Sequence, residues 1–60
     1  MKIIIDAMGG DNAPGEIVKG AVEAAGHTDS RIVLVGDQAK IEQCLKSCNA
    51  SSSLFEIVHT

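Results

Sequence analysis

The chain opens on a stretch that combines a strand, a glycine turn and a helix start. Residues 3–14 read Ile3-Ile4-Ile5-Asp6-Ala7-Met8-Gly9-Gly10-Asp11-Asn12-Ala13-Pro14. The three isoleucines show no alternation with polar residues, which is typical of a parallel strand covered by helices. A glycine pair permits a tight turn with backbone N–H groups close to a ligand, and a proline suits the first helical turn. The stretch therefore predicts a strand, a ligand-binding loop and a helix.

The predicted loop combines anion-binding amides with acidic side chains. Unpaired amides at a helix N-terminus, together with the helix dipole, favour an anion such as phosphate. Asp6 and Asp11 suit a hydroxyl group, a cation or a basic side chain better than direct contact with phosphate. The spacing matches neither G-x-G-x-x-G nor G-x-x-x-x-G-K-[ST], so no motif supports a dinucleotide or P-loop nucleotide site. On spacing alone, a turn that only reverses the chain fits equally well.

The rest of the chain continues the alternation of strands and helices. Residues 14–25 carry one apolar stripe and predict a helix, in which Gly20 is expected to pack closely against the sheet. Apolar runs predict strands over residues 31–35 and 54–58. Asp37 is placed to cap a second helix that follows the middle strand.

This order predicts an α/β fold, a three-layer αβα Rossmann-like parallel sheet of which these residues supply a β-α-β-α-β portion. Right-handed crossovers make the strands parallel and allow the two helices to cover the faces of the sheet. The strand orders 3-2-1 and 2-1-3 both satisfy the pattern. A chain of 60 residues buries only about 60% of the surface that its unfolded form exposes. We therefore expect residues 1–60 to be the N-terminal part of a single, larger α/β domain.

Composition argues against several classes of protein. The formal net charge is −3 and the five basic residues are dispersed, which disfavours nucleic-acid binding. The N-terminal apolar run leads directly into Asp6 and is far too short for a signal peptide or a membrane span. We therefore expect a cytoplasmic protein, with any peripheral membrane association made by regions outside these residues. Cys44 and Cys48 are expected to be buried apolar residues on the second helix, and no metal site is expected because no further ligands lie nearby.

Polar residues follow the predicted strands at their carboxyl ends, where open α/β sheets place their ligands. Asp6 is the leading candidate for a functional residue; the alternative is a carboxylate that only accepts hydrogen bonds from the loop. Asp11 and Asn12 suit either ligand binding or helix capping. His59 carries an imidazole, which can act as an acid, a base or a donor to phosphate, and its alternative is a structural role.

The run from Asp6 to Pro14 resembles the opening signature of the bacterial phosphate acyltransferases of phospholipid synthesis, the PlsX family. Further matches follow in order at Leu34-Val35-Gly36-Asp37, Ile41-Glu42 and Val58-His59. The resemblance covers essentially the whole chain. It implies an enzyme that transfers a fatty acyl group from acyl carrier protein to inorganic phosphate, giving an acyl phosphate.

The resemblance also implies which residues and partners take part. Asp6 and His59 are the candidate catalytic residues, and phosphate is expected to bind at Met8, Gly9, Gly10, Asp11 and Asn12. Phosphate attacks the thioester directly in this chemistry, so no protein nucleophile and no metal or organic cofactor is expected. The expected partners are acyl carrier protein with its fatty acyl chain, inorganic phosphate and a second copy in a homo-oligomer. Two alternatives stay open, namely a non-catalytic structural half-sheet and a nucleotide- or dinucleotide-binding domain.

Overall fold

The computed structural model of the protein describes residues 1–60, except for the side chain of Ser52. Strands and helices alternate as the sequence predicts, and the strands lie within one residue of their predicted positions. In chain order the elements are β1 (Lys2–Asp6), α1 (Gly15–Ala25), β2 (Arg31–Gly36), α2 (Gln38–Ser47), the short 3-10 helix η1 (Ser52–Leu54) and β3 (Phe55–His59). The predicted α/β fold class is confirmed.

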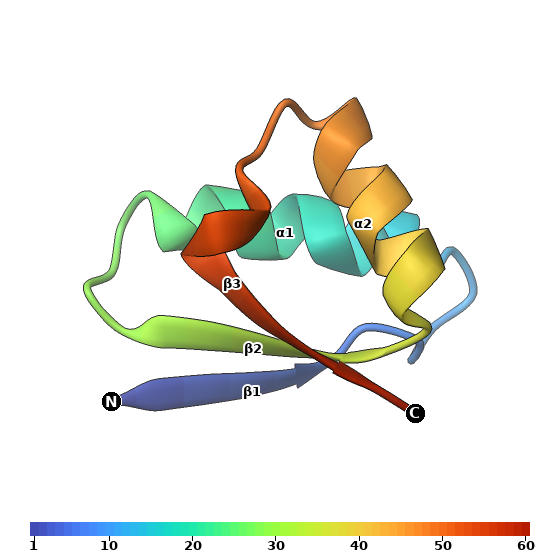
Figure 1. The fold of residues 1–60 in the computed structure, drawn as a ribbon, viewed down its shortest axis with the longest axis horizontal. Coiled ribbons are helices and arrows are strands. Elements are labelled where there is room, and N and C mark those ends of the chain that lie inside the picture. Colours follow the sequence, from blue (N-terminus) through green and yellow to red (C-terminus); the bar gives the residue numbers. More distant parts are fainter.

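The three strands form one parallel sheet in the order β1-β2-β3 (Figure 1). This is the first of the two strand orders that the sequence left open. Ile5 pairs with Leu34 across the first strand boundary, and Leu34 pairs with Ile57 across the second. Because the strands are parallel, all three carboxyl ends lie at the same edge of the sheet, which we call the carboxyl rim.

Both helices pack on the same face of the sheet and against each other (Figure 1). The core lies between the layers, and its fully buried large side chains are Val18, Ile32, Leu34, Ile41 and Leu45. The expectation that the two helices cover both faces was therefore wrong for these residues. In the order β1-β2-β3, two right-handed crossovers proceed in the same direction across the sheet, so they place both helices on the same side.

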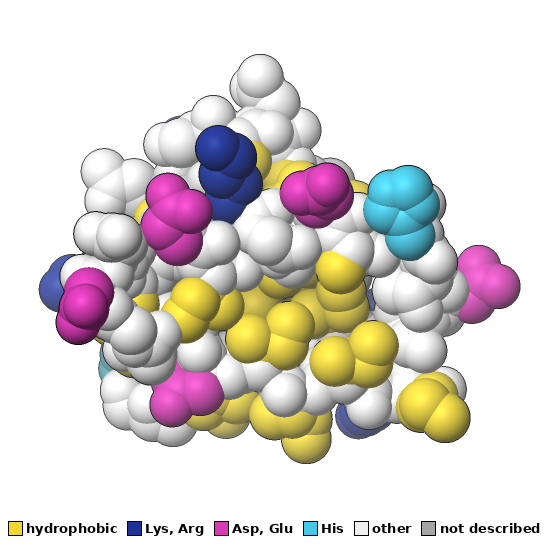
Figure 2. Space-filling model, turned by 180° about the vertical axis from the view of Figure 1, so that it is seen from behind, with side chains coloured by type: hydrophobic (Ala, Val, Ile, Leu, Met, Phe, Trp, Pro, Cys, Tyr) yellow, Lys and Arg dark blue, Asp and Glu magenta, His cyan; other side chains and the backbone are white. Residues whose placement is uncertain are grey.

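The opposite face of the sheet carries no helix from residues 1–60. Ile4 of β1 is 71% exposed and Val58 of β3 is 42% exposed. Lys2 Nζ reaches across this face to Glu56 Oε1 at 3.6 Å, a solvent-exposed ion pair that contributes at most about 1 kcal/mol. The side of the molecule turned away from the view of Figure 1, where the helix layer lies above the sheet, also has hydrophobic side chains across its middle with charged side chains around them (Figure 2). The described residues thus form two layers, one sheet and one layer of helices, and the third layer of the predicted arrangement stays a prediction.

The predicted packing of Gly20 was wrong. Val18 and Ala21 form the buried stripe of α1, whereas Gly20 is exposed and a Cβ added there would meet no atom within 4 Å. The apolar neighbours of Gly20 in the sequence indicated burial, but its own position on the helix turns it to solvent.

The two cysteines are free, and they differ in exposure. Cys44 is half-buried and packs against the core, in partial agreement with the prediction. Cys48 is exposed, contrary to the prediction, because α2 ends at Ser47 and Cys48 lies at its C-cap. Neither α1 nor α2 has the length and apolar composition that a membrane crossing requires.

Candidate functional site

The loop that joins β1 to α1 lies at the carboxyl rim. Ala7 continues the pairing of β1, because its N–H donates to the carbonyl oxygen of Val35 at 2.9 Å. The chain then turns at Met8, whose N–H donates to Asp6 Oδ1 at 3.0 Å. The N–H of Gly9 points back to the Asp6 carbonyl oxygen at 3.5 Å. The Asp6 carboxylate therefore holds the turn, which is the structural role that the sequence offered as the alternative to catalysis.

The next part of the loop presents its backbone to solvent. We call residues 8–12 the glycine loop, and every residue in it is exposed. Gly10 has a φ of 112°, a conformation that glycine adopts readily and other residues rarely do. Within the described part of the chain, the amides of Gly10, Asp11 and Asn12 donate no hydrogen bond. Three unpaired donors at a strand-to-helix junction can bind an anion.

Helix α1 begins directly after this loop without a side-chain cap. Pro14 was predicted to lie in the first turn, but it occupies the N-cap position and the helix begins at Gly15. Two backbone bonds define this helix start, one from the Glu16 N–H to the Asn12 carbonyl oxygen at 3.3 Å and one from the Val18 N–H to the Pro14 carbonyl oxygen at 2.9 Å. Since no side chain caps the helix, capping does not account for Asp11 or Asn12.

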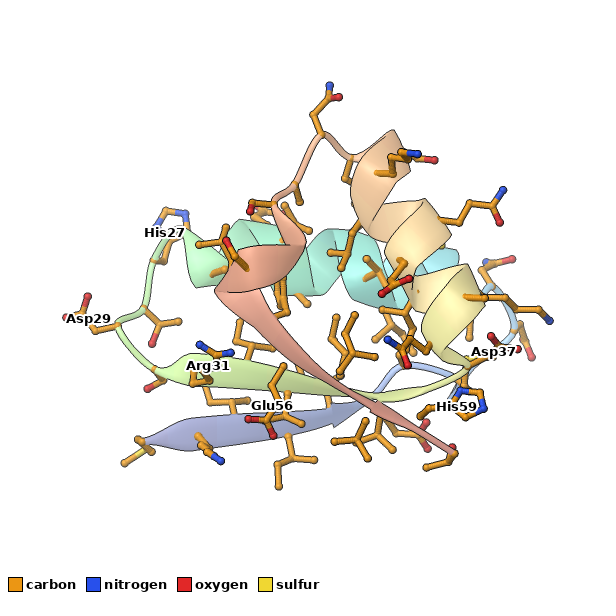
Figure 3. All side chains as sticks on the ribbon, in the orientation of Figure 1. His27, Asp29, Arg31, Asp37, Glu56 and His59 are labelled. Atoms are coloured by element: carbon orange, nitrogen blue, oxygen red, sulfur yellow. The ribbon has the colours of Figure 1, made fainter. Side chains whose placement is uncertain are left out.

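Helix α2 begins at the same rim, and side chains accept hydrogen bonds from the amides of its first turn. Asp37 Oδ1 accepts a hydrogen bond from the Lys40 N–H at 3.2 Å, which confirms the predicted cap. His59 Nδ1 accepts a hydrogen bond from the Gln38 N–H at 3.0 Å. Figure 3 shows Asp37 and His59 side by side at this end of the molecule, with His27 at the opposite end. The histidine contact was missed by sequence reasoning because it joins residues 21 positions apart.

The two candidate catalytic residues share the rim without being neighbours. Asp6 ends β1 and His59 ends β3, and β2 lies between these strands. Because Nδ1 of His59 accepts the bond from the Gln38 N–H, the neutral ring carries its proton on Nε2, which can donate a hydrogen bond. Asp6 Oδ2 lies beside Gly9, at 3.7 Å from the position that a Cβ would take there. The structure thus gives Asp6 and His59 separate surroundings within one site.

The charge at the rim is mainly negative. Asp6, Asp11 and Asp37 surround it, and Lys40 lies in the first turn of α2. An anion on the glycine loop would therefore rely on backbone donors, with additional positive charge from outside these residues.

Comparison with known proteins agrees with the resemblance seen in the sequence. Residues 1–60 match a family model described as "Fatty acid synthesis protein". The phosphate acyltransferase of Moorella thermoacetica is 55% identical over 60 residues, which cover 100% of this chain and 17% of the relative. That of Heliobacterium modesticaldum is 56% identical over 59 residues, covering 97% of this chain and 18% of the relative. That of Geobacillus thermodenitrificans is 60% identical over 48 residues, covering 78% of this chain and 15% of the relative.

The chain therefore spans 17% of the length of the first of these relatives. The match nevertheless extends across all of its residues and includes the whole glycine loop. The predicted family resemblance is confirmed: the chain belongs to the fatty acid synthesis protein family, and its relatives named here are phosphate acyltransferases.

Proposed function

We propose that the protein containing this chain transfers a fatty acyl group from acyl carrier protein to inorganic phosphate. The observation that carries the proposal is the 55% identity to a phosphate acyltransferase over all 60 residues. The exposed, unpaired amides of the glycine loop support it, because they are suited to an oxyanion. The product is an acyl phosphate for phospholipid synthesis.

The proposed reaction is a direct acyl transfer. A phosphate oxygen attacks the thioester carbonyl carbon and forms a C–O bond, giving a tetrahedral oxyanion. The oxyanion collapses, the C–S bond breaks, and the thiolate of the carrier takes up a proton as the thiol. The protein therefore has to orient phosphate and stabilise the developing negative charge, and it needs no nucleophile of its own.

The rim residues have distinct proposed roles. The amides of Gly10, Asp11 and Asn12 bind phosphate. Met8 and Gly9 form the turn that orients these amides. Asp6 holds this turn through its bond to the Met8 N–H and stays a candidate catalytic residue through its second carboxylate oxygen. His59 stays a candidate through its Nε2–H, which can donate a hydrogen bond to an oxyanion while Nδ1 accepts one from α2.

The partners of the reaction rest on the family resemblance. We propose acyl carrier protein as the acyl donor, a cytoplasmic location and a homodimer. Acyl carrier proteins are acidic, whereas this chain has a formal net charge of −3. The basic surface that binds the carrier is therefore proposed to lie in the part of the protein beyond these residues.

A phosphate titration of the full-length protein, followed by amide NMR, tests the binding site. We expect inorganic phosphate to shift the amide signals of Gly10, Asp11 and Asn12. Absence of shifts in the glycine loop would favour a purely structural half-sheet. Shifts caused by NAD or ATP, with none caused by phosphate, would favour the nucleotide-binding alternative.

A second assay tests the chemistry. Acyl-acyl carrier protein is incubated with the full-length protein, and both the released carrier thiol and the acyl phosphate are measured. We expect both products to form in equal amounts and only when phosphate is present. Thiol release without phosphate would indicate thioester hydrolysis and contradict the proposed transfer.

A further inference from the structure

The last residue of β2, Gly36, lies in a space that has no room for a side chain. It is buried, and a Cβ built on its backbone would lie 2.5 Å from Met8 Cγ and 2.9 Å from Met8 Sδ. Ile41 Cδ1 would lie 3.4 Å from the same Cβ. The two contacts to Met8 are closer than van der Waals packing allows, so any side chain at Gly36 would displace the methionine.

Met8 is the first residue of the glycine loop, and three contacts hold the chain there. The Ala7 N–H bonds to the carbonyl oxygen of Val35, the residue before Gly36. The Met8 N–H bonds to Asp6 Oδ1. The Met8 side chain then fills the space above Gly36. Between Met8 and Asn12, whose carbonyl oxygen accepts a bond from the Glu16 N–H, the loop has only the weak 3.5 Å bond from the Gly9 N–H. The direction in which the loop leaves the sheet is therefore set at Met8.

We propose that Gly36 is a positioning residue for the phosphate-binding amides. Because Gly36 has no side chain, Met8 can pack directly above it, in a space that we call the seat of Met8. The packed methionine in turn fixes where the amides of Gly10, Asp11 and Asn12 point. This inference rests on the proposed function, since the loop must bind phosphate for its position to affect the reaction. A displacement of about 1 Å in a binding group can lower an enzymatic rate about 100-fold.

The test uses three variants of the full-length protein: Gly36→Ala, Met8→Ala and the double variant. Gly36→Ala forces Met8 out of its seat, and we expect the KM for phosphate to rise about 10- to 100-fold with a smaller change in kcat. Met8→Ala removes both Cγ and Sδ from the contact. In that background only the backbone strain at a φ of 155° remains. We therefore expect Gly36→Ala to raise the KM for phosphate by a clearly smaller factor than in the wild-type protein, because residues in contact have non-additive effects.

Two results would overturn the proposal. One is an unchanged KM for phosphate in Gly36→Ala. The other is an equal rise in KM when Gly36→Ala is made in the wild-type protein and in the Met8→Ala variant. That result would assign the effect to the backbone conformation of Gly36, whose φ is 155°. Gly20→Ala is the matched control, because a Cβ there meets no atom within 4 Å, and it should leave the KM unchanged.

Amide NMR without phosphate separates this inference from the proposed function. We expect Gly36→Ala to shift the signals of Gly9 and Gly10, and the double variant to return them to the Met8→Ala positions. Those shifts test the seat even if the wild-type protein forms no acyl phosphate, a result that would contradict the proposed function alone. If Gly36→Ala is insoluble, a soluble double variant with the KM of Met8→Ala would support the inference, and an insoluble one would overturn it.

Discussion

The two helices begin at the same rim of the sheet, but side chains cap the first turn of only one of them. At α2, Asp37 and His59 accept hydrogen bonds from the amides of Lys40 and Gln38. At α1, no side chain caps the first turn. The difference follows from the connections, because a single residue joins β2 to α2, whereas residues 7–14 join β1 to α1. The short connection places side-chain acceptors at the first amides of α2, whereas in the long connection the amides of Gly10, Asp11 and Asn12 have no partner among the described residues.

Under the proposed function, the start of α1 is where the ligand binds and the start of α2 is a structural support. Both strands end next to buried residues, Ala7 after β1 and Gly36 in β2. The same edge of the sheet therefore carries one connection with paired amides, between β2 and α2, and one loop with unpaired amides, between β1 and α1. Three predictions test this division.

Gly10→Val is expected to have the largest effect. Valine at a φ of 112° is strained by about 1–3 kcal/mol, and the loop would move to relieve it. We expect acyl-phosphate formation to fall about 100-fold, a larger loss than the change in melting temperature would explain. The assay compares the activity and melting temperature of the full-length variant with those of the wild type.

The control for this variant is Gly20→Val, which places the same side chain on the exposed face of α1. It should retain wild-type activity. Wild-type activity in Gly10→Val would remove the glycine loop from the mechanism and abolish the distinction between the two helix starts.

Asp37→Ala is expected to have an intermediate effect, on stability. Loss of the N-cap of α2 should lower the free energy of unfolding by about 1 kcal/mol, measured by urea denaturation of the full-length protein. Asp37→Asn keeps an oxygen acceptor and should retain most of the stability. A phosphate KM that changes as strongly as in Gly10→Val would show that α2 also takes part in binding.

His59→Ala is expected to have the smallest effect. It removes one acceptor from the start of α2 and should lower the free energy of unfolding by about 0.5 kcal/mol, the low end for a hydrogen bond, because the contact is exposed to solvent. His59→Asn can place its amide oxygen near the position of Nδ1, so it should restore the stability. Equal stability of His59→Ala and the wild type would mean that the contact does not support the helix.

The same pair of variants addresses the candidate catalytic role of His59. Asparagine can replace the acceptor Nδ1 but has no N–H at the position of Nε2. Loss of acyl-phosphate formation in a fully stable His59→Asn would therefore support a role in the reaction for the Nε2–H donor. Retained activity would limit His59 to the support of α2.

The features that depend on neighbouring residues could be predicted from the sequence. The isoleucine run before Asp6 indicated a strand that ends at the rim, and Asp37 indicated a helix cap. Both predictions rest on short-range physics, the burial of consecutive apolar residues and a hydrogen bond between residues three positions apart.

The features that depend on long-range packing could not be predicted. Both strand orders satisfied the same pattern, because the order depends on how the helices pack. The contacts of His59 with Gln38 and of Met8 with Gly36 join residues far apart in the chain. Gly20 and Cys48 were misplaced because apolar periodicity does not determine how far a helix extends or how it is rotated on the sheet.

The exposed thiol at the C-cap of α2 has a practical consequence. Cys48 lies at the far end of a helix of 10 residues whose first turn is at the rim, a separation of about 15 Å. A fluorophore attached to this native sulfur would sit outside the glycine loop yet within energy-transfer range of a labelled substrate. The fold thus provides a built-in reporter position from which occupancy of the rim can be followed in solution.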